Sequence, residues 1–357
     1  MSAYLEKAFL VIASIWGLFR IIAIRPPILV YGNDMLGGQM YEPRMAGVYE
    51  WLVKNKVPFA HIVHATPTGR VVRHWWRRRE PVVYLGALSH SLFVVLMRVV
   101  RCRAVLAIDD YRFWPLVVGM ARNAGVSSFL FQHGRFTRHQ EYLKMAHAPL
   151  PTKYVVWNEH WKGKILALSP LFSKHQDVVL VGGKPSGGQG SPQRLVREPE
   201  GRLRVMVVHE PDMKRADVHM MIQALVKSEE ISLIYKIRKD QSAEQQIAHH
   251  GLESFLDTNL ISVTPDVLPC DLVLGSYSTL LYEMVAMGIP VGVLQVGSTQ
   301  ADDLVEDGLA MPVDPSSSTF MAQVQVAANV SDADLAMKSQ VLAVSADIRR
   351  TLGDLLL

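Results

Sequence analysis

The 357-residue sequence contains only two cysteines, Cys102 and Cys270, and it has no CxxC or HExxH motif. Each cysteine lies in or beside an apolar segment, which is typical of small buried side chains. This usage disfavours a disulfide framework and fits a reducing cytoplasm. Because the common zinc motifs are missing, we expect no metal site.

The N-terminal segment lacks an uninterrupted apolar run long enough to cross a bilayer. The run Ala8–Phe19 is followed by Arg20, and about 20 apolar residues would be needed for a span. No small-residue cleavage site follows, so a secretory signal is not indicated. Residues 1–27 therefore predict an apolar helix in a membrane interface, with Trp16 among the headgroups. A buried or dimer-forming helix is the alternative.

Acidic residues are scarce in the first half of the chain. Residues 1–183 hold 23 Lys and Arg against 10 Asp and Glu, whereas the remainder holds 14 against 23. This asymmetry indicates different partners for the two halves. The basic half should face an anionic partner such as a phospholipid surface or a lipid-linked phosphate.

Short apolar runs alternate with helical stretches along both halves, which predicts an α/β protein with two Rossmann-like, doubly wound domains facing a cleft. We expect an acceptor domain over residues 28–183, a Pro/Gly/Ser-rich linker over 184–202, a donor domain over 203–330 and a helical tail over 331–357. The expected strands are 28–31, 59–64, 82–85, 104–108, 128–131, 154–157, 178–181, 204–208, 232–237, 261–263, 272–274 and 291–294.

Several of these strands end in side chains that suit proton transfer. The first opens into a Gly-rich loop containing Asp34, which is our first choice of general base, with an Asx-turn residue as the alternative. Behind it come Asp109 and Asp110 at one strand end and His133 at the next. His133 lies near Arg135, and this grouping suits either phosphate contact or proton transfer. A structural histidine is the plain alternative.

Residues 70–80, RVVRHWWRRRE, combine two tryptophans with five arginines and a histidine. Solvated charge runs usually lack indoles, so we expect this patch to contact an acceptor or a membrane surface. Nucleic-acid binding also uses aromatic and basic residues, but no known nucleic-acid module accompanies the patch, and we expect no nucleic-acid partner. The residues expected to contact the acceptor or the membrane are Trp75, Trp76, Arg77, Arg78 and Arg79, together with Arg135.

In the second half, two features indicate phosphate recognition. Lys236 and Arg238 crowd one strand end of an otherwise acidic domain. Residues 271–294 predict a strand, a polar turn, a helix and a second strand, with Ser278 or Thr279 as the helix cap. The amides at such a helix start can hold an anion. An ordinary helix cap is the alternative.

Taken together, four segments resemble the GT-B glycosyltransferases of bacterial surface-polysaccharide synthesis, and within them the capsule-type transferases and the CDP-glycerol glycerophosphotransferases. They are Gln132-His133-Gly134, Trp157-Asn158, Lys236-x-Arg238 and Ser276-Tyr277-Ser278-Thr279-x-x-x-Glu283-x-x-x-x-Gly288-x-Pro290. The resemblance covers roughly residues 28–330 in layout. Related transferases of acidic sugars often carry a Lys-Pro-His-Pro-like segment where this chain has Lys236-Ile237-Arg238-Lys239, so the donor nucleotide is left open.

The resemblance implies a nucleotide-sugar donor site in the second domain and a glycan or lipid-linked acceptor on the first. Ser278 and Thr279 would hold the donor phosphates, Ser276 would belong to the same donor site with Lys236 and Arg238, and Glu283 would take ribose hydroxyls. His209 and Glu210 would line the cleft. The reaction would be a metal-independent displacement with no cofactor, on the inner face of the cytoplasmic membrane, in capsule or lipopolysaccharide synthesis.

Three other functions fit the same residues. A CDP-glycerol-type glycerophosphotransferase would use the same phosphate sites but cleave the pyrophosphate. A nucleotide-sugar epimerase of the same fold would need no acceptor. A non-catalytic polysaccharide assembly protein would bind no nucleotide.

Overall fold

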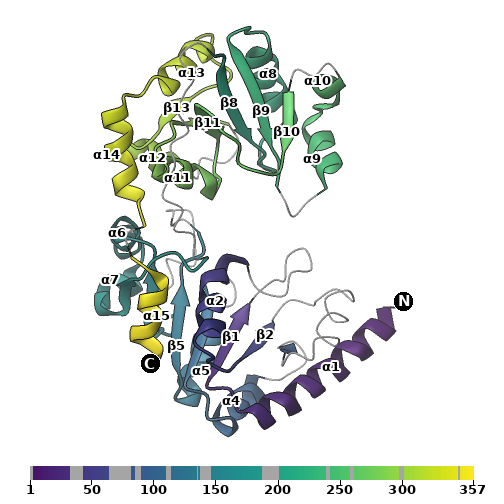
Figure 1. The fold of residues 1–357 in the computed structure, drawn as a ribbon, viewed down its shortest axis with the longest axis vertical. Helices are drawn as coiled ribbons and strands as arrows, with labels where there is room; N and C mark the ends of the chain where they lie inside the picture. Colours follow the sequence, from purple (N-terminus) through teal and green to yellow (C-terminus); the bar gives the residue numbers. More distant parts are fainter. Residues whose placement is uncertain are drawn as a thin grey trace. The chain divides into compact units, whose positions relative to one another are not determined.

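The chain forms two compact units (Figure 1). Unit 1 comprises Met1–Gln189 and Val344–Leu357, and unit 2 comprises Gly190–Ala343. The computed structural model describes residues 3–32, 43–63, 82–84, 90–109, 114–134, 136, 146–186, 201–238, 242–257, 261–296, 301–344 and 346–357. Most of the expected linker lies outside these ranges, and the expected cleft between two domains stays a prediction.

Unit 1 is built on a parallel sheet with the strand order β3-β2-β1-β4-β5-β6-β7 among the described residues. Its strands are β1 (Ile28–Gly32), β2 (Phe59–Val63), β3 (Val82–Tyr84), β4 (Ala104–Ile108), β5 (Ser127–Phe131), β6 (Lys153–Val156) and β7 (Val179–Val181). The strand order reverses between β1 and β4. In sheets of this kind, ligands bind at the carboxyl ends of the strands beside such a switch point.

Helices connect these strands and cover the sheet. They are α1 (Ala3–Ile24), η2 (Pro43–Met45), α2 (Ala46–Lys54), α4 (His90–Val99), α5 (Trp114–Ala124), α6 (Glu159–Leu168), α7 (Pro170–Lys174), η5 (Gln176–Val178) and α15 (Ile348–Leu356). Alternate residues of β1, β4 and β5 point to one face, where they form a core with α2 and α15. Helix α5 packs on β4 and β5.

Unit 2 repeats the same plan with the order β10-β9-β8-β11-β12-β13, all parallel. Its strands are β8 (Leu203–Val208), β9 (Ile231–Lys236), β10 (Ile261–Thr264), β11 (Leu272–Gly275), β12 (Val291–Leu294) and β13 (Met311–Val313). Its helices are α8 (Arg215–Val226), α9 (Ala243–His250), α10 (Glu253–Asp257), α11 (Thr279–Ala286), α12 (Asp302–Glu306), α13 (Phe320–Ala328) and α14 (Asp332–Leu342). The switch point lies between β8 and β11.

The two parallel sheets confirm the α/β class and the two Rossmann-like domains. The expected helical tail is divided between the units: α14 packs against α11, whereas α15 belongs to unit 1. Two glycines leave room for α15 and the residues before it to pack against unit 1. A Cβ atom on Gly182 would lie 2.7 Å from the Cγ2 atom of Thr351, and one on Gly183, at φ +89°, would lie 2.3 Å from the carbonyl oxygen of Ala346.

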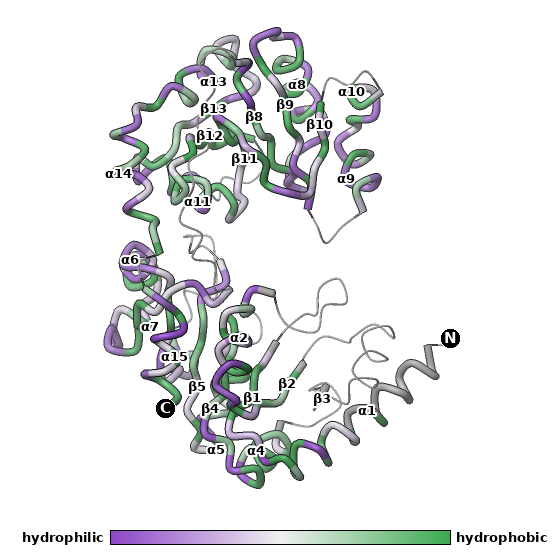
Figure 2. The backbone as a smooth tube through the Cα atoms, in the orientation of Figure 1, coloured by the Kyte–Doolittle hydropathy of each residue, from purple (hydrophilic) through white to green (hydrophobic). Residues whose placement is uncertain are grey.

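The N-terminal segment forms one helix, α1, over most of its length. None of the described helices is long and apolar enough to cross a bilayer. Large apolar side chains of α1 are nevertheless exposed, with Phe19 at 65%. Figure 2 shows hydrophobic residues along the C-terminal part of α1 and along α4.

Candidate functional sites at the two switch points

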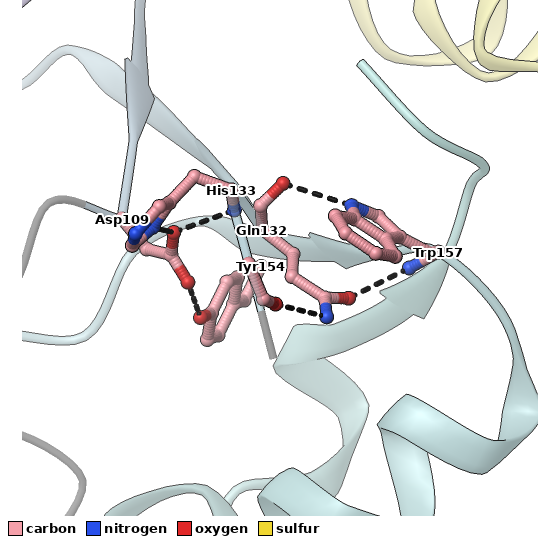
Figure 3. Close-up of polar contacts among 6 residues, drawn as sticks. Asp109, Gln132, His133, Tyr154 and Trp157 are labelled. Carbon is pink, nitrogen blue, oxygen red and sulfur yellow. Dashed lines mark hydrogen bonds and ion pairs between the residues drawn. The ribbon is translucent and has the colours of Figure 1, made fainter. Parts of the chain in front are cut away.

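In unit 1, the ends of β4 and β5 and the neighbouring strand β6 bring together Asp109, His133 and Tyr154 (Figure 3). Asp109 directly follows β4, His133 lies two residues beyond β5, and Tyr154 lies on β6. One carboxylate oxygen of Asp109 accepts the backbone amide of His133 at 2.7 Å and also contacts the Nδ1 atom of its ring. The other oxygen accepts a hydrogen bond from the hydroxyl of Tyr154.

The exposures of these side chains assign different roles to them. Asp109 is 1% exposed, whereas the side chain of His133 is 19% exposed. Asp109 is therefore placed to orient the ring and to stabilise its positive charge, and His133 is the member that can meet a substrate. A histidine paired with a buried carboxylate in this way can serve as a general base.

A second set of hydrogen bonds fixes the backbone beside His133. The side chain of Gln132 is fully buried; its Oε1 atom accepts the amide of Trp157 at 3.0 Å, and its Nε2 atom donates to the carbonyl of Gly134 at 2.6 Å. The indole of Trp157 donates to the carbonyl of Gln132 at 2.9 Å. These bonds tie the end of β5 to the end of β6, so the direction of the His133 side chain is set by the sheet.

Several predicted residues of unit 1 lie outside the described residues. They are Asp34, Asp110, Arg135 and the basic aromatic patch of Trp75, Trp76, Arg77, Arg78 and Arg79. Their roles stay predictions. Tyr154, by contrast, was not predicted, because a tyrosine inside an apolar strand gives no signal of polar contact.

In unit 2, the carboxylate of Glu210 fills the turn between β11 and α11. It accepts the amides of Ser276 at 2.6 Å, Tyr277 at 2.9 Å and Ser278 at 2.7 Å. Glu210 is 1% exposed. Successive amides of this kind form an anion-binding nest, and here the anion is a side chain of the protein itself.

This arrangement changes the predicted phosphate cradle. Ser278 is the cap of α11, as expected, and its hydroxyl accepts the amide of Leu280 at 3.2 Å. Ser276 is fully buried, and its hydroxyl donates to the carbonyl of Val296 at 2.8 Å. The three amides that precede the helix are held by Glu210, so a bound phosphate would have to use other groups. Donor contacts by Ser276, Ser278, Thr279 and Glu283 stay predictions; the last two are half-buried on α11.

Two cationic side chains lie at the carboxyl end of β9, the strand that pairs with β8. Lys236 ends β9 and is half-buried, and Arg238 is exposed two residues later. The backbone of Arg238 is clamped by Gln246, whose Oε1 atom accepts its amide at 2.7 Å and whose Nε2 atom donates to its carbonyl at 2.9 Å. The positive charge of Arg238 contributes to lowering the pKa of His209. The predicted cationic strand end therefore adjoins the end of β8.

His209, the other predicted residue at the end of β8, is buried. Its ring contacts Tyr235 and His250, neither of which was predicted as a site residue. Burial, followed by the neighbouring His250, His249 and Arg238, lowers the pKa of His209 to about 3. His209 is therefore neutral at pH 7.

Within the described part of the chain, no three His, Cys, Asp or Glu side chains gather in a way that would hold a metal ion.

The chain is similar to solved GT-B structures across nearly its whole length. MurG from Acinetobacter baumannii matches at 13% identity and a TM-score of 0.59, over 93% of this chain and 99% of that one. The glycosyltransferase of kitacinnamycin matches at 14% identity and a TM-score of 0.60, over 93% and 98%. UDP-GlcNAc 2-epimerase from Neisseria meningitidis, bound to UDP-GlcNAc, matches at 12% identity and a TM-score of 0.59, over 92% and 98%.

No protein-family model matches the chain, and no curated protein matches it. At these identities the structural matches show the fold, which is GT-B, as the four sequence segments suggested.

Proposed function

We propose that this chain is a glycosyltransferase that moves a sugar from a nucleotide-activated donor to a hydroxyl group of a surface-glycan or lipid-linked acceptor. The observation that carries the proposal is the arrangement of Asp109 and His133 at the carboxyl ends of β4 and β5, with Tyr154 reaching Asp109 from the neighbouring strand β6. The protein must supply a general base for the acceptor hydroxyl, because an alcohol must lose its proton as it attacks the sugar. The transferases among the structural matches support this reading.

In the proposed reaction, Nε2 of His133 takes the proton of the acceptor hydroxyl. The oxygen then bonds to the anomeric carbon while the bond from that carbon to the nucleotide phosphate breaks. Asp109 stabilises the imidazolium that forms. Lys236 and Arg238 supply positive charge for the leaving phosphate on unit 2, and no metal takes part in this scheme.

The donor is proposed to be a nucleotide sugar bound by unit 2. Solved matches include Anabaena Alr3699/HepE in complex with UDP and glucose, and epimerases bound to UDP-GlcNAc. UDP-sugars are therefore the first donors to test, followed by CMP-, CDP-, GDP- and dTDP-activated compounds. Ligand that binds only the folded state raises the melting temperature, so a thermal-shift screen identifies the nucleotide.

Turnover of His133→Ala tests the proposal. Removing a general base should lower the rate of nucleotide release in the presence of acceptor by about 10²- to 10⁴-fold, while calorimetry shows unchanged nucleotide affinity. His175→Ala, at the exposed end of α7, is the matched control. Asp34→Asn is measured in parallel, since Asp34 was the first choice of base. An active His133→Ala enzyme combined with an inactive Asp34→Asn enzyme would transfer the role to Asp34.

A nucleotide-sugar 2-epimerase is the second candidate. Epimerase structures match this chain over the same share as the transferases do. An epimerase needs no acceptor, so conversion of a nucleotide sugar incubated alone would favour it. Turnover of CDP-glycerol but of no sugar nucleotide would instead favour a glycerophosphotransferase. Absence of any nucleotide binding by a folded protein would favour a polysaccharide assembly protein.

We also propose that unit 1 carries the protein to the inner face of the cytoplasmic membrane. The exposed apolar residues of α1 recur at helical spacing; they are Ile12, Ile15, Trp16, Phe19 and Ile22. Helix α4 exposes a second apolar row of Leu92, Val95 and Val99, with Arg98 exposed among them. Apolar side chains interspersed with arginine suit an anionic lipid surface.

A further inference from the structure

Beneath the end of β8, three buried side chains form one hydrogen-bonded chain. The Nδ1 atom of His209 lies 2.9 Å from the hydroxyl oxygen of Tyr235, and that oxygen lies 2.5 Å from the Nδ1 atom of His250. The Nε2 atom of His250 lies 3.2 Å from the carbonyl oxygen of Met213. His209 directly follows β8, Tyr235 lies on β9 and His250 ends α9, and each is at least 97% buried.

The direction of each hydrogen bond follows from the end of this chain. A carbonyl oxygen only accepts, so Nε2 of His250 must carry a proton and donate it to Met213. Burial lowers the pKa of His250 to about 4, so the ring is neutral and its Nδ1 atom carries a lone pair instead of a proton. The hydroxyl of Tyr235 must therefore donate to His250.

The remaining bond is then determined. Because the proton of the Tyr235 hydroxyl is used, its oxygen accepts the Nδ1–H of His209. Burial raises the pKa of Tyr235, so the hydroxyl keeps that proton. His209 is neutral as well, which leaves its Nε2 atom without a proton. Among the described residues, no group donates a hydrogen bond to that atom.

The position of His209 suggests which groups of a ligand its Nε2 lone pair would contact. His209 lies at the switch point of unit 2, directly before Glu210, whose carboxylate holds residues 276–278. An unprotonated nitrogen attracts hydroxyl and N–H groups and repels phosphate oxygens, which carry only lone pairs. The side chain is therefore unsuited to a diphosphate, although histidine beside arginine is often expected to bind one.

We infer that His209 is a specificity-determining residue whose Nε2 atom accepts a hydrogen bond from a hydroxyl or N–H group of the bound nucleotide or its sugar. Tyr235 and His250 are positioning residues that hold the required tautomer. The inference rests on the proposed function in one respect, namely that unit 2 binds a nucleotide. If the inference holds, groups other than His209 bind the diphosphate, and His209 accepts a hydrogen bond from a hydroxyl or N–H group of the ligand.

The tautomer is tested without any ligand. Long-range ¹H–¹⁵N spectra of wild-type protein labelled with [¹⁵N]histidine distinguish Nδ1–H from Nε2–H rings at pH 7, and single variants assign the signals. We expect Nδ1–H for His209 and Nε2–H for His250. Tyr235→Phe should turn His209 into a mixture of tautomers, a change that a merely structural tyrosine would not cause. An Nε2–H signal or an imidazolium signal for wild-type His209 would overturn the inference.

The contact is tested by calorimetry with nucleoside diphosphates and with pyrophosphate. His209→Asn removes the Nε2 acceptor and should weaken nucleotide binding by about 3- to 10-fold, the effect of one hydrogen bond. His209→Gln places a carbonyl oxygen near the same position and should restore most of the affinity. Pyrophosphate binding should be equal in all three proteins. His219→Asn, on α8, is the matched control.

The outcomes separate this inference from the proposed function. Equal nucleotide affinity in wild type and His209→Asn would overturn the inference alone. Equal losses for pyrophosphate and nucleotide would do the same, because they would place His209 on the phosphates. A wild-type protein that binds no nucleotide would overturn the contact and the proposed function together.

Discussion

A Cβ atom added to Gly275 would lie 3.2 Å from the Oε1 atom of Glu210 and 2.9 Å from the Cδ2 atom of Leu281. A side chain at the end of β11 would crowd this carboxylate where it reaches the three amides of the following turn. Gly275→Ala should therefore displace Glu210 and lower the free energy of unfolding of unit 2 by about 1–3 kcal/mol. Hydrogen exchange of amides 276–278 should quicken at the same time.

Gly163→Ala is the control, because its added Cβ atom meets nothing within 4 Å on helix α6. Alanine in a helix should be neutral or stabilising there, by about 0.5–1 kcal/mol. Glu210→Gln separates shape from charge, since a carboxamide keeps the size but loses an acceptor. Unchanged exchange at residues 276–278 in both Gly275→Ala and Glu210→Gln would mean that the carboxylate does not hold the turn.

The attachment of α15 to unit 1 should fail when Gly183 is changed to alanine. The added Cβ atom would overlap the carbonyl oxygen of Ala346, and the residue already has φ +89°. Gly125→Ala is a matched control with φ +72° and nothing within 4 Å, so it bears only the conformational cost of about 1 kcal/mol. Limited proteolysis should release the C-terminal segment from Gly183→Ala and leave it intact in Gly125→Ala. Equal protection in both variants would contradict this account of the docking.

Unit 1 should lose stability in mild acid because of His61. Burial lowers the pKa of His61 to about 4 from an ordinary value of 6.5. Below pH 6.5, His61 is protonated in the unfolded chain but stays neutral in the folded chain. The free energy of unfolding therefore falls as the pH drops, by about 1.4 kcal/mol per pH unit until pH 4. Between pH 6.5 and 5 this amounts to about 2 kcal/mol.

Denaturant unfolding of His61→Phe measures this contribution. His61 packs against the rings of Tyr49 and Phe59, where phenylalanine keeps an aromatic contact. The difference in stability between wild type and variant should shift toward the variant as the pH falls from 6.5 to 5. A difference that stays constant over this interval would show that His61 is protonated in the folded state.

Binding to anionic vesicles should depend on the exposed face of α1. Phe19→Glu and Trp16→Glu should each reduce co-sedimentation with phosphatidylglycerol-containing vesicles several-fold, because a carboxylate opposes both the apolar and the electrostatic term. Val95→Glu tests whether α4 contributes. Met220→Glu, at an exposed position of α8, is the control. Retention of vesicle binding by the double variant of Trp16 and Phe19 would rule out an interfacial α1.

The strands of both sheets could be predicted from sequence because parallel strands covered on both faces are continuous apolar runs. The twelve expected strands are found within one or two residues at each end. The missed strand, β13, has only three residues, Met311–Val313, and its proline hides the pattern. The division of the C-terminal tail was also missed, since no local sequence pattern indicates that α15 packs beside Gly182 and Gly183.

The candidate sites were predictable as strand ends but not as contacts. His133 and Asp109 were both named, yet their roles follow from burial, which depends on how β4 and β5 pair; Ile108 lies opposite Phe131 in that register. Glu210 was expected to line a ligand site, which stays a prediction, and in the structure its carboxylate accepts the amides of residues 276–278 of its own domain. Gly275, just before the Ser-Tyr-Ser turn, was the available sign that another group approaches the backbone there. That group, the carboxylate of Glu210, lies 65 residues earlier in the sequence and could not be identified from the local pattern.

The return of α15 to unit 1 also affects the order in which the chain can fold. Ile348 and Leu352 belong to the same core as β1, β4 and β5, so this core stays incomplete on the ribosome until α15 emerges. Unit 2 is contained within one continuous segment, Gly190–Ala343, and can reach its native state first. The C-terminal half of the protein is therefore free to mature before the N-terminal half, the reverse of the order of synthesis.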